Sequence, residues 1–212
     1  MVFLLSSNNV ETILYYIGLI NKKAVVVILN QNINSNNLKN LLIKYKPNYL
    51  ILDKNYPLKN NYKILKIEKN YKILVRKKIF EHKIFKDLGI LLSTSGTTGN
   101  PKFVRLSYQN YFDNSESIIK SIKLNQSDSV VTTLPISYTY GLSIINTFLI
   151  SGAKIILNKS SILEKKFWDV YREYKPSHFY GVPFIFEILF KLNFKNLFTK
   201  KLKTIALAGG KA

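Results

Sequence analysis

The sequence predicts an α/β protein with mostly parallel, layered sheets and flanking helices. Short runs of aliphatic and β-branched residues alternate along the chain with amphipathic stretches of helical length. Several of these runs are continuously apolar, which is typical of parallel strands that are buried on both faces. The chain has 212 residues, which suits one domain or one domain plus part of another.

The first half of the chain contains two predicted helix–strand repeats. Residues 8–11 resemble a helix capping box and predict a helix to about residue 20. The β-branched run at 24–29 predicts a buried strand. Ser35 is placed to cap a helix that Pro47 terminates, and residues 49–52 predict the next strand.

The segment 54–86 is rich in lysine and contains two short alternating pieces, at 62–67 and 71–75. We expect these pieces to be peripheral strands joined by loop. The apolar run 88–92 and the alternating run 103–106 then predict two strands on either side of a glycine-containing loop.

The second half continues the alternation. Ser107 is expected to cap a helix to about residue 123. The remaining predicted strands are 130–134, 153–157, 178–180 and 203–208. The remaining predicted helices are 141–150, 162–174 with Trp168 on its apolar face, and 183–192 with Pro183 in its first turn.

The loop at residues 92–102 carries the strongest chemical signal. It holds two glycines, five hydroxyl side chains and Lys102. Glycines let backbone N–H groups approach an anion closely, hydroxyls donate to phosphate oxygens, and lysine adds a positive charge. The loop differs from a Walker P-loop because Asn100 and Pro101 stand between the second glycine and Lys102, and a strand comes next. The alternative is a Ser/Gly-rich hairpin without a ligand.

Two other turns also follow predicted strands, at residues 135–141 and at Gly209 and Gly210. Ligands of parallel α/β sheets bind at the carboxyl ends of the strands. We therefore expect the loop at 92–102 and these two turns to line one crevice.

Composition excludes several classes of site. The chain has no cysteine, which rules out disulfides and cysteine-based metal sites. His82 and His178 are far apart in sequence and lack ligand-like spacing. The formal net charge is +20, with 32 basic and 12 acidic residues. Because the lysines are scattered, we expect no nucleic-acid partner, and a basic nucleic-acid-binding protein is only the third-ranked interpretation.

The N-terminal sequence and the hydropathy pattern indicate in which cellular compartment the protein is expected. The first five residues are apolar but lack a basic segment before them and form too short a run for a signal peptide. No stretch approaches the length of about 18 apolar residues that a membrane span requires. The expected location is cytoplasmic.

Several ordered motifs together resemble one family, the adenylate-forming (AMP-binding) superfamily of acyl-CoA synthetases and adenylation domains. The string Ser-Thr-Ser-Gly-Thr-Thr-Gly-Asn-Pro-Lys at 93–102 is similar to its phosphate-loop signature. Residues 106–110 resemble the segment after that loop, and 135–141 resemble its Pro-x-x-His-x-x-Gly element. Residues 180–183 resemble a Gly-Val-Pro segment, and 207–210 resemble the strand and turn that pack against adenine.

The resemblance implies ATP-dependent activation of a carboxylic acid as an acyl-adenylate, followed by transfer to a thiol of coenzyme A or of a phosphopantetheinyl carrier protein. It implies ATP and Mg²⁺ as cofactors. Tyr138 would lie at the acyl pocket, and Gly209 and Gly210 against the adenine. The resemblance assigns catalytic roles to Thr98, Lys102 and Tyr138. The residues that it assigns to the pyrophosphate-holding loop are Thr94, Ser95, Gly96, Thr97, Thr98, Gly99 and Lys102.

The chain also departs from the family pattern. Phe103 replaces a glycine, and Tyr108 and Tyr138 stand where histidine is common. A tyrosine at 138 can form a wall of the pocket and make hydrogen bonds, but it cannot carry a positive charge near neutral pH. No acidic residue lies between Asp128 and Glu164, so a buried substrate ammonium would lack a counter-charge. This favours a carboxylate without an α-amine, with an amino-acid-activating adenylation domain as an alternative.

The resemblance places the remaining machinery beyond residue 212: the glutamate that binds Mg²⁺, the ribose-binding aspartate, and a C-terminal domain with a catalytic lysine. The start also looks short by one or two elements. We expect residues 1–86 and 87–212 to be successive parts of one large AMP-binding domain, with the C-terminal domain absent. The chain would then be an incomplete, inactive fragment. The alternative is a non-catalytic nucleotide-binding or interaction module of the same fold.

Overall fold

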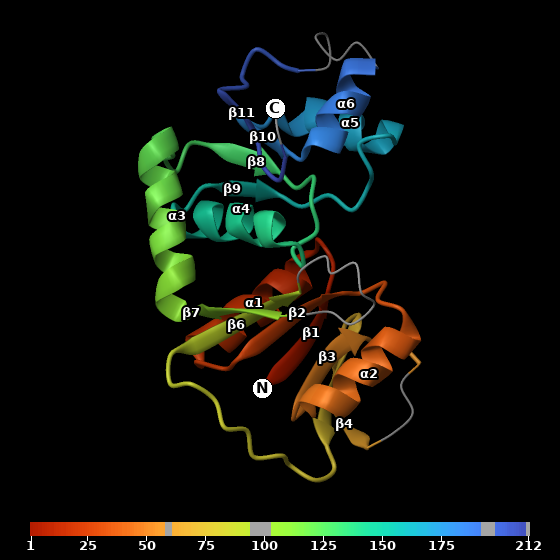
Figure 1. Cartoon of the computed structure of the whole chain (residues 1–212). Coiled ribbons are helices and arrows are strands. Elements are labelled where there is room, and N and C mark those ends of the chain that lie inside the picture. The colour runs from red at the N-terminus through yellow and green to blue at the C-terminus, as the bar shows by residue number, and fades with distance from the viewer. Residues whose placement is uncertain (58–60, 94–102, 192–197, 211–212) are drawn as a thin grey trace. The chain divides into compact units, whose positions relative to one another are not determined.

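The chain forms two compact units, Met1–Asn110 and Tyr111–Ala212, each with its own sheet (Figure 1). The computed structural model describes residues 1–57, 61–93, 103–191 and 198–210. The predicted α/β class, with flanking helices, is confirmed. The expectation that residues 1–86 and 87–212 are successive parts of one large domain stays a prediction.

The first unit contains a seven-stranded sheet in the order β4-β5-β3-β1-β2-β6-β7. Its strands are β1 Val2–Ser6, β2 Val26–Asn30, β3 Tyr49–Asp53, β4 Tyr62–Glu68, β5 Tyr71–Arg76, β6 Leu88–Ser93 and β7 Phe103–Ser107. The strands β3, β1, β2 and β6 pair in parallel. The pairings that add β5, β4 and β7 at the edges are antiparallel. The sheet is therefore parallel at its centre, and the lysine-rich segment supplies one edge, as expected.

The central strand β1 is the element that the sequence left unassigned. All five of its residues are buried, and it pairs with β2 on one side and β3 on the other. Phe3 and Leu5 belong to the hydrophobic cluster on the face that α2 (Ser35–Tyr45) covers. The helix α1 (Val10–Asn21) lies on the opposite face (Figure 1).

The helix caps of the first unit come from asparagines. The predicted start of α1 is confirmed, but the capping box expected at residues 8–11 is wrong by one position: Asn9 is the N-cap, and its side chain accepts a hydrogen bond from the Thr12 N–H at 2.8 Å. The predicted cap of α2 is wrong by one position. Asn34 is the N-cap and accepts from the Asn36 N–H at 2.8 Å, whereas Ser35 is the first helical residue. The Asn34 side-chain oxygen, one residue upstream of Ser35, satisfies one of the free N–H groups at the start of the helix.

The second unit contains a four-stranded, fully parallel sheet in the order β11-β10-β8-β9. Its strands are β8 Ser129–Val131, β9 Lys154–Ile156, β10 His178–Gly181 and β11 Thr204–Leu207. The helices are α3 Tyr108–Ile122, α4 Thr139–Ile150, α5 Lys165–Tyr174 and α6 Pro183–Lys191. Pro183 occupies the first position of α6, as predicted.

The cap of α3 (Tyr108–Ile122) is confirmed. Ser107 and Asn110 bond reciprocally before this helix: the Ser107 hydroxyl accepts from the Asn110 N–H at 3.0 Å, and the Asn110 side chain accepts from the Ser107 N–H at 3.0 Å. This exchange is the capping-box geometry with asparagine as the second partner.

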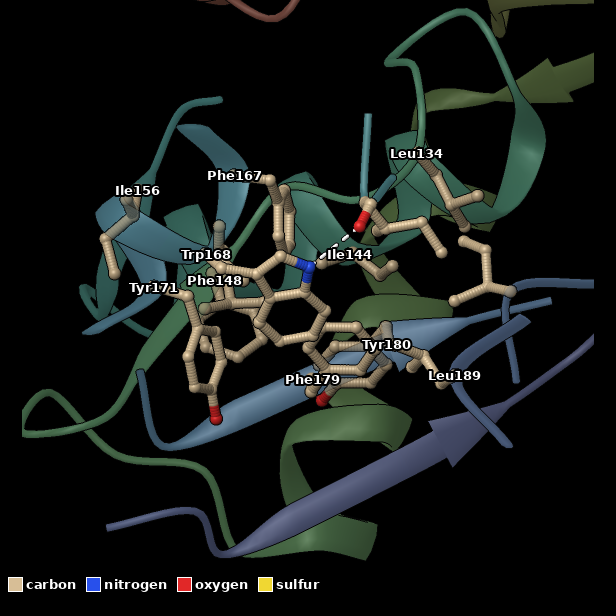
Figure 2. Close-up of a cluster of buried hydrophobic side chains, with 14 of the residues drawn as sticks. Leu134, Ile144, Phe148, Ile156, Phe167, Trp168, Tyr171, Phe179, Tyr180 and Leu189 are labelled. Carbon is tan, nitrogen blue, oxygen red and sulfur yellow. Dashed lines mark hydrogen bonds between the residues drawn. The ribbon is translucent and has the colours of Figure 1, made fainter. Parts of the chain in front are cut away.

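Aromatic rings build the core of the second unit (Figure 2). Trp168 stacks on Phe179 at a centroid distance of 6.5 Å and meets Tyr171 edge-on at 5.5 Å. The Trp168 indole N–H donates to the Ile162 carbonyl at 2.8 Å. The predicted apolar position of Trp168 is confirmed, but α5 begins at Lys165 rather than at residue 162. Ile162 instead lies in a turn before the helix.

Candidate nucleotide site

Three turns of the second unit lie at one edge of its sheet. They follow β8, β10 and β11, which run in parallel, so their carboxyl ends meet at the same edge. The turns contain the sequence motifs at 135–141, 181–183 and 208–210. All three turns belong to the second unit.

The first turn is folded tightly around Gly141. The Tyr138 N–H donates to the Pro135 carbonyl at 3.0 Å, and the Tyr138 carbonyl accepts from the Leu142 N–H at 2.9 Å. A Cβ at Gly141 would lie 2.2 Å from the Pro135 carbonyl oxygen. Only a glycine allows this backbone contact. The close approach of Gly141 to Pro135 therefore fixes the backbone of the turn that carries Tyr138.

Tyr138 extends from this turn to the end of β11. Its side chain is 40% exposed, and its hydroxyl would be 3.3 Å from a Cβ placed on Gly209. Gly209 has a φ of +89°, a conformation that favours glycine. The nearest other atom to that position is the Cγ1 of Val182, at 3.8 Å. The predicted site residues Tyr138 and Gly209 are therefore neighbours.

Gly210 connects the turn at 208–210 to the motif at 181–183. A Cβ on Gly210 would meet the Pro183 Cγ at 2.6 Å, so the turn after β11 packs directly on the first residue of α6. Both glycines are exposed. An exposed backbone without side chains beside a phenol ring suits a flat aromatic group such as adenine.

The proposed phosphate loop cannot be compared with this geometry. Thr94, Ser95, Gly96, Thr97, Thr98, Gly99 and Lys102 all lie outside the described residues. The strands on either side of the loop are those predicted, and Ser93 pairs with Phe103 in antiparallel register. The predicted crevice formed by all three loops also stays a prediction, since the loop and the other two turns belong to different units.

The described residues offer no set of metal ligands. Within residues 1–57, 61–93, 103–191 and 198–210 there is no group of three or more His, Asp or Glu side chains that could hold a metal ion. In the same described part of the chain, no helix is both long and apolar enough to cross a membrane.

A buried ionic cluster lies at the opposite, amino-terminal edge of the second sheet. Asp128 is 2% exposed, and its carboxylate accepts from the Lys203 ammonium at 2.6 Å and from the Ser177 hydroxyl at 3.2 Å. The Asn125 N–H donates to its second oxygen at 3.0 Å. The Nε2 of His178 lies 3.5 Å away. Sequence reasoning missed this cluster, because no local pattern links Asp128 to Lys203, 75 residues further along the chain.

The protonation of this cluster follows from its contacts. Burial by itself raises the pKa of Asp128, but the hydrogen bonds from Lys203, the Asn125 N–H and Ser177 hold that pKa below its ordinary value. Burial lowers the pKa of His178, and the Asp128 carboxylate offsets this effect only in part. Asp128 is therefore ionised and His178 neutral near neutral pH.

We expect the stability of the second unit to fall in two steps on acidification. Between a lowered folded pKa and the unfolded value, the unfolded chain binds more protons, so stability decreases as pH falls. His178 contributes below about pH 6.5, and Asp128 contributes below about pH 4. Thermal unfolding followed by the fluorescence of Trp168, the one tryptophan in the sequence, measures both steps.

The His178→Gln variant should flatten the upper step. His82, in the first unit, also has a pKa lowered by burial, so His82→Gln is the matched control. An upper step in the Trp168 signal that survives in His178→Gln and disappears in His82→Gln would contradict the assignment.

Comparison with known proteins identifies the family. The family model "AMP-binding enzyme" matches residues 1–212, and the chain belongs to this family. It is 30% identical over 114 residues to oxalate–CoA ligase of Saccharomyces cerevisiae, covering 53% of this chain and 21% of that protein. It is 30% identical over 122 residues to 2-succinylbenzoate–CoA ligase of Listeria innocua, covering 58% and 26%. These relatives are CoA ligases, so the family is enzymatic.

Solved structures show the same fold. CmiS6 superposes with a TM-score of 0.81 at 17% identity, over 99% of this chain and 52% of that one. The o-succinylbenzoate CoA synthetase of Bacillus subtilis, in complex with its acyl-adenylate intermediate, gives 0.76 at 18% identity, over 100% and 56%. The chain thus spans about half the length of the solved structures, and its matches span about a quarter of the curated relatives.

Proposed function

We propose that this chain is the nucleotide-binding part of an enzyme that activates a carboxylic acid as an acyl-adenylate and passes the acyl group to a thiol. Membership of the AMP-binding family supports this class of reaction. The observation that carries the assignment to particular residues is the contact of Tyr138 with Gly209 and of Gly210 with Pro183. Three separate sequence motifs meet there at the carboxyl ends of parallel strands, where α/β proteins bind ligands.

The proposed reaction has two steps. A carboxylate oxygen of the substrate attacks the α-phosphorus of ATP, and the bond to the pyrophosphate breaks. A thiol then loses its proton and attacks the acyl carbon, and AMP leaves. Positioning and charge stabilisation on the phosphates account for most of the catalysis in reactions of this kind.

The residue roles in this proposal follow the motifs. The loop residues from Thr94 to Gly99, with Thr98 and Lys102 in catalytic roles, would hold the pyrophosphate through N–H groups, hydroxyls and one ammonium. Tyr138 would form a wall of the acyl pocket and hold the substrate carboxylate beside the ribose phosphate. Gly209 and Gly210 would lie against the adenine because their exposed backbone carries no side chain.

The substrate class in this proposal is a carboxylic acid without an α-amine. Asp128 is the acid nearest in sequence to the 135–141 turn on its N-terminal side, and it is paired with Lys203 at the amino ends of the strands. It is therefore not available to balance an ammonium beside Tyr138. An amino-acid substrate would need an acidic group from elsewhere, which keeps the adenylation-domain alternative second.

The proposal also covers the thiol acceptor, the metal ion that accompanies ATP, the cellular compartment, and whether this chain acts alone. The thiol belongs to coenzyme A or to a phosphopantetheinyl carrier protein, and Mg²⁺ accompanies ATP with its glutamate ligand outside this chain. The protein acts in the cytoplasm, which cell fractionation would test. Because this chain lacks the motifs that the resemblance assigns to Mg²⁺ and to the catalytic lysine, we propose that it is incomplete and does not catalyse adenylation alone.

Binding and turnover measurements on the purified chain test this proposal together. We expect AMP to bind, as measured by calorimetry, because the adenine side of the site is present. We expect no ATP-dependent exchange of labelled pyrophosphate with any carboxylate, because the remaining machinery is absent. Robust exchange would refute the incomplete-fragment part, and failure to bind AMP or ATP would refute the nucleotide site.

A non-catalytic nucleotide-binding module of the same fold is the second candidate. The contacts of Tyr138 and Gly209 suit nucleotide binding without requiring turnover. The two candidates differ when the missing part is supplied. Fusion to the whole part of a related CoA ligase that follows the matched region, with its Mg²⁺ glutamate, ribose-binding aspartate and C-terminal domain, should restore exchange to a fragment of an enzyme and should leave a binding module inactive.

A further inference from the structure

Asp128 and Lys203 connect the turn before β8 to the residue before β11. Lys203 directly precedes β11, and its ammonium lies 2.6 Å from the buried Asp128 carboxylate although 75 residues separate the two in sequence. The Lys203 side chain is 53% exposed, so its stem runs along the surface and only its charged end meets Asp128. A buried carboxylate that loses its cation is strongly destabilising, which makes this the preferred position for the end of the lysine.

Ser177 links the third strand into the same cluster. Its hydroxyl donates to Asp128 at 3.2 Å and accepts from the Ser129 N–H at 2.8 Å. Its carbonyl accepts from the Lys203 N–H at 2.7 Å and from the Thr204 N–H at 3.2 Å. The amino ends of β8, β10 and β11 are therefore held together by side-chain and backbone bonds around one carboxylate.

The strand β11 is held by its backbone pairing with β10, and the Asp128–Lys203 pair adds a side-chain anchor at its amino end. It is four residues long and lies at the edge of the sheet, paired only with β10 within the described residues. None of its residues is fully buried, and Ile205 is 49% exposed. Short edge strands with weak burial have weakly specified register. A slip by one residue would move the following turn by about 3.3 Å along the strand.

We propose that Lys203 is a positioning residue for nucleotide binding: its pair with Asp128 sets the register of β11 and so places Gly209 beside Tyr138. This rests on the proposed nucleotide site. The pair acts over the length of one strand, from the amino end of the sheet to its carboxyl end. It touches neither the nucleotide nor Tyr138.

Amide hydrogen exchange and ligand affinity test the proposal in Lys203→Met. We expect the amides of β11 and the 208–210 turn to lose protection, while those of β9 keep it. We expect AMP affinity to fall by about tenfold or more, equivalent to 1.4 kcal/mol. Binding of inorganic pyrophosphate, which the proposal assigns to the 94–102 loop, should not change.

Two other variants serve as controls. Lys203→Arg should retain the amide protection of β11 and the affinity for AMP, because its guanidinium can still pair with Asp128. Lys201→Met, an exposed lysine two residues upstream, is the matched control.

The double variant Asp128→Asn/Lys203→Met separates positioning from plain stabilisation. Removing both charges avoids an unpaired buried carboxylate, so the double variant should fold even where Lys203→Met does not. If Lys203 only neutralises Asp128, AMP affinity returns in the double variant, and the proposal is overturned. If Lys203 positions β11, AMP affinity stays low while the unfolding temperature recovers.

The outcomes also separate this proposal from the proposed function. A wild-type chain that binds no AMP or ATP refutes the nucleotide site. In that case amide exchange still decides the role of the pair. Unchanged protection of β11 and its turn in Lys203→Met overturns the positioning role whether or not a nucleotide binds.

Discussion

Substitution of Gly141 by alanine is expected to unfold the second unit or destabilise it severely. The added Cβ would lie 2.2 Å from the Pro135 carbonyl oxygen and 2.9 Å from its carbonyl carbon, both of which are backbone atoms. A flexible side chain could move away, but a backbone turn that also holds the first turn of α4 cannot move without losing its hydrogen bonds. We expect a loss of about 4 kcal/mol or more, which is exceptional for one methyl group and typical of severe overpacking.

Urea denaturation followed by Trp168 fluorescence measures this effect, because the indole lies in the core of the second unit. The matched control is Gly18→Ala in α1. A Cβ at Gly18 meets no atom within 4 Å outside its own helix backbone, so alanine should stabilise that helix by about 0.5–1 kcal/mol and leave the Trp168 midpoint at the wild-type value. A Gly141→Ala protein with the wild-type midpoint would mean that the 135–141 turn is looser than its contacts indicate.

The order of helices and strands could be predicted because hydrophobic period and caps are local properties. The Asn9 cap, the Ser107 cap and Pro183 at the start of α6 each depend on residues within a few positions. The central strand β1 could not be predicted in the same way. Its five residues are uniformly apolar, and periodicity does not distinguish such a short run from other buried segments. Its place is decided by pairing with β2 and β3.

The start of α5 shows how tertiary contacts override a local pattern. The apolar residue Ile162 extends the helical period of 165–174 and suggests an earlier start. In the structure the Ile162 carbonyl accepts the indole N–H of Trp168, and the Glu164 N–H bonds to the Ser161 carbonyl at 2.9 Å. A buried indole needs an acceptor, so the turn forms in place of the first helical residues.

The candidate site was predictable in part for a structural reason. Turns that follow parallel strands of one sheet must share an edge, so Tyr138 and Gly209 could be expected to be neighbours from their positions in sequence. The Asp128–Lys203 pair could not, since no local pattern links residues 75 positions apart. Such pairs follow from strand order in the sheet, which the sequence alone did not provide.

Substitution of Gly209 by alanine is expected to impair nucleotide binding while the second unit stays folded. Two effects add at this position. The φ of +89° is unfavourable for a residue with a Cβ, and the Cβ would press on the Tyr138 hydroxyl at 3.3 Å. The strain should cost about 1–3 kcal/mol of stability. The phenol must also move, so we expect AMP affinity to fall by about 10- to 100-fold, or 1.4–2.8 kcal/mol.

Gly152 provides a control with the same kind of backbone strain. Its φ is +69°, and the three atoms nearest to an added Cβ all belong to the Gln126 side chain, the first at 3.4 Å. Gly152 precedes β9, at the amino-terminal edge of the sheet, far along the strands from the proposed adenine position. Gly152→Ala should therefore lower stability to a similar extent and leave AMP affinity unchanged. Equal losses of AMP affinity in the two variants would show that the effect at Gly209 is general strain, and the assignment of the adenine to this turn would then be wrong.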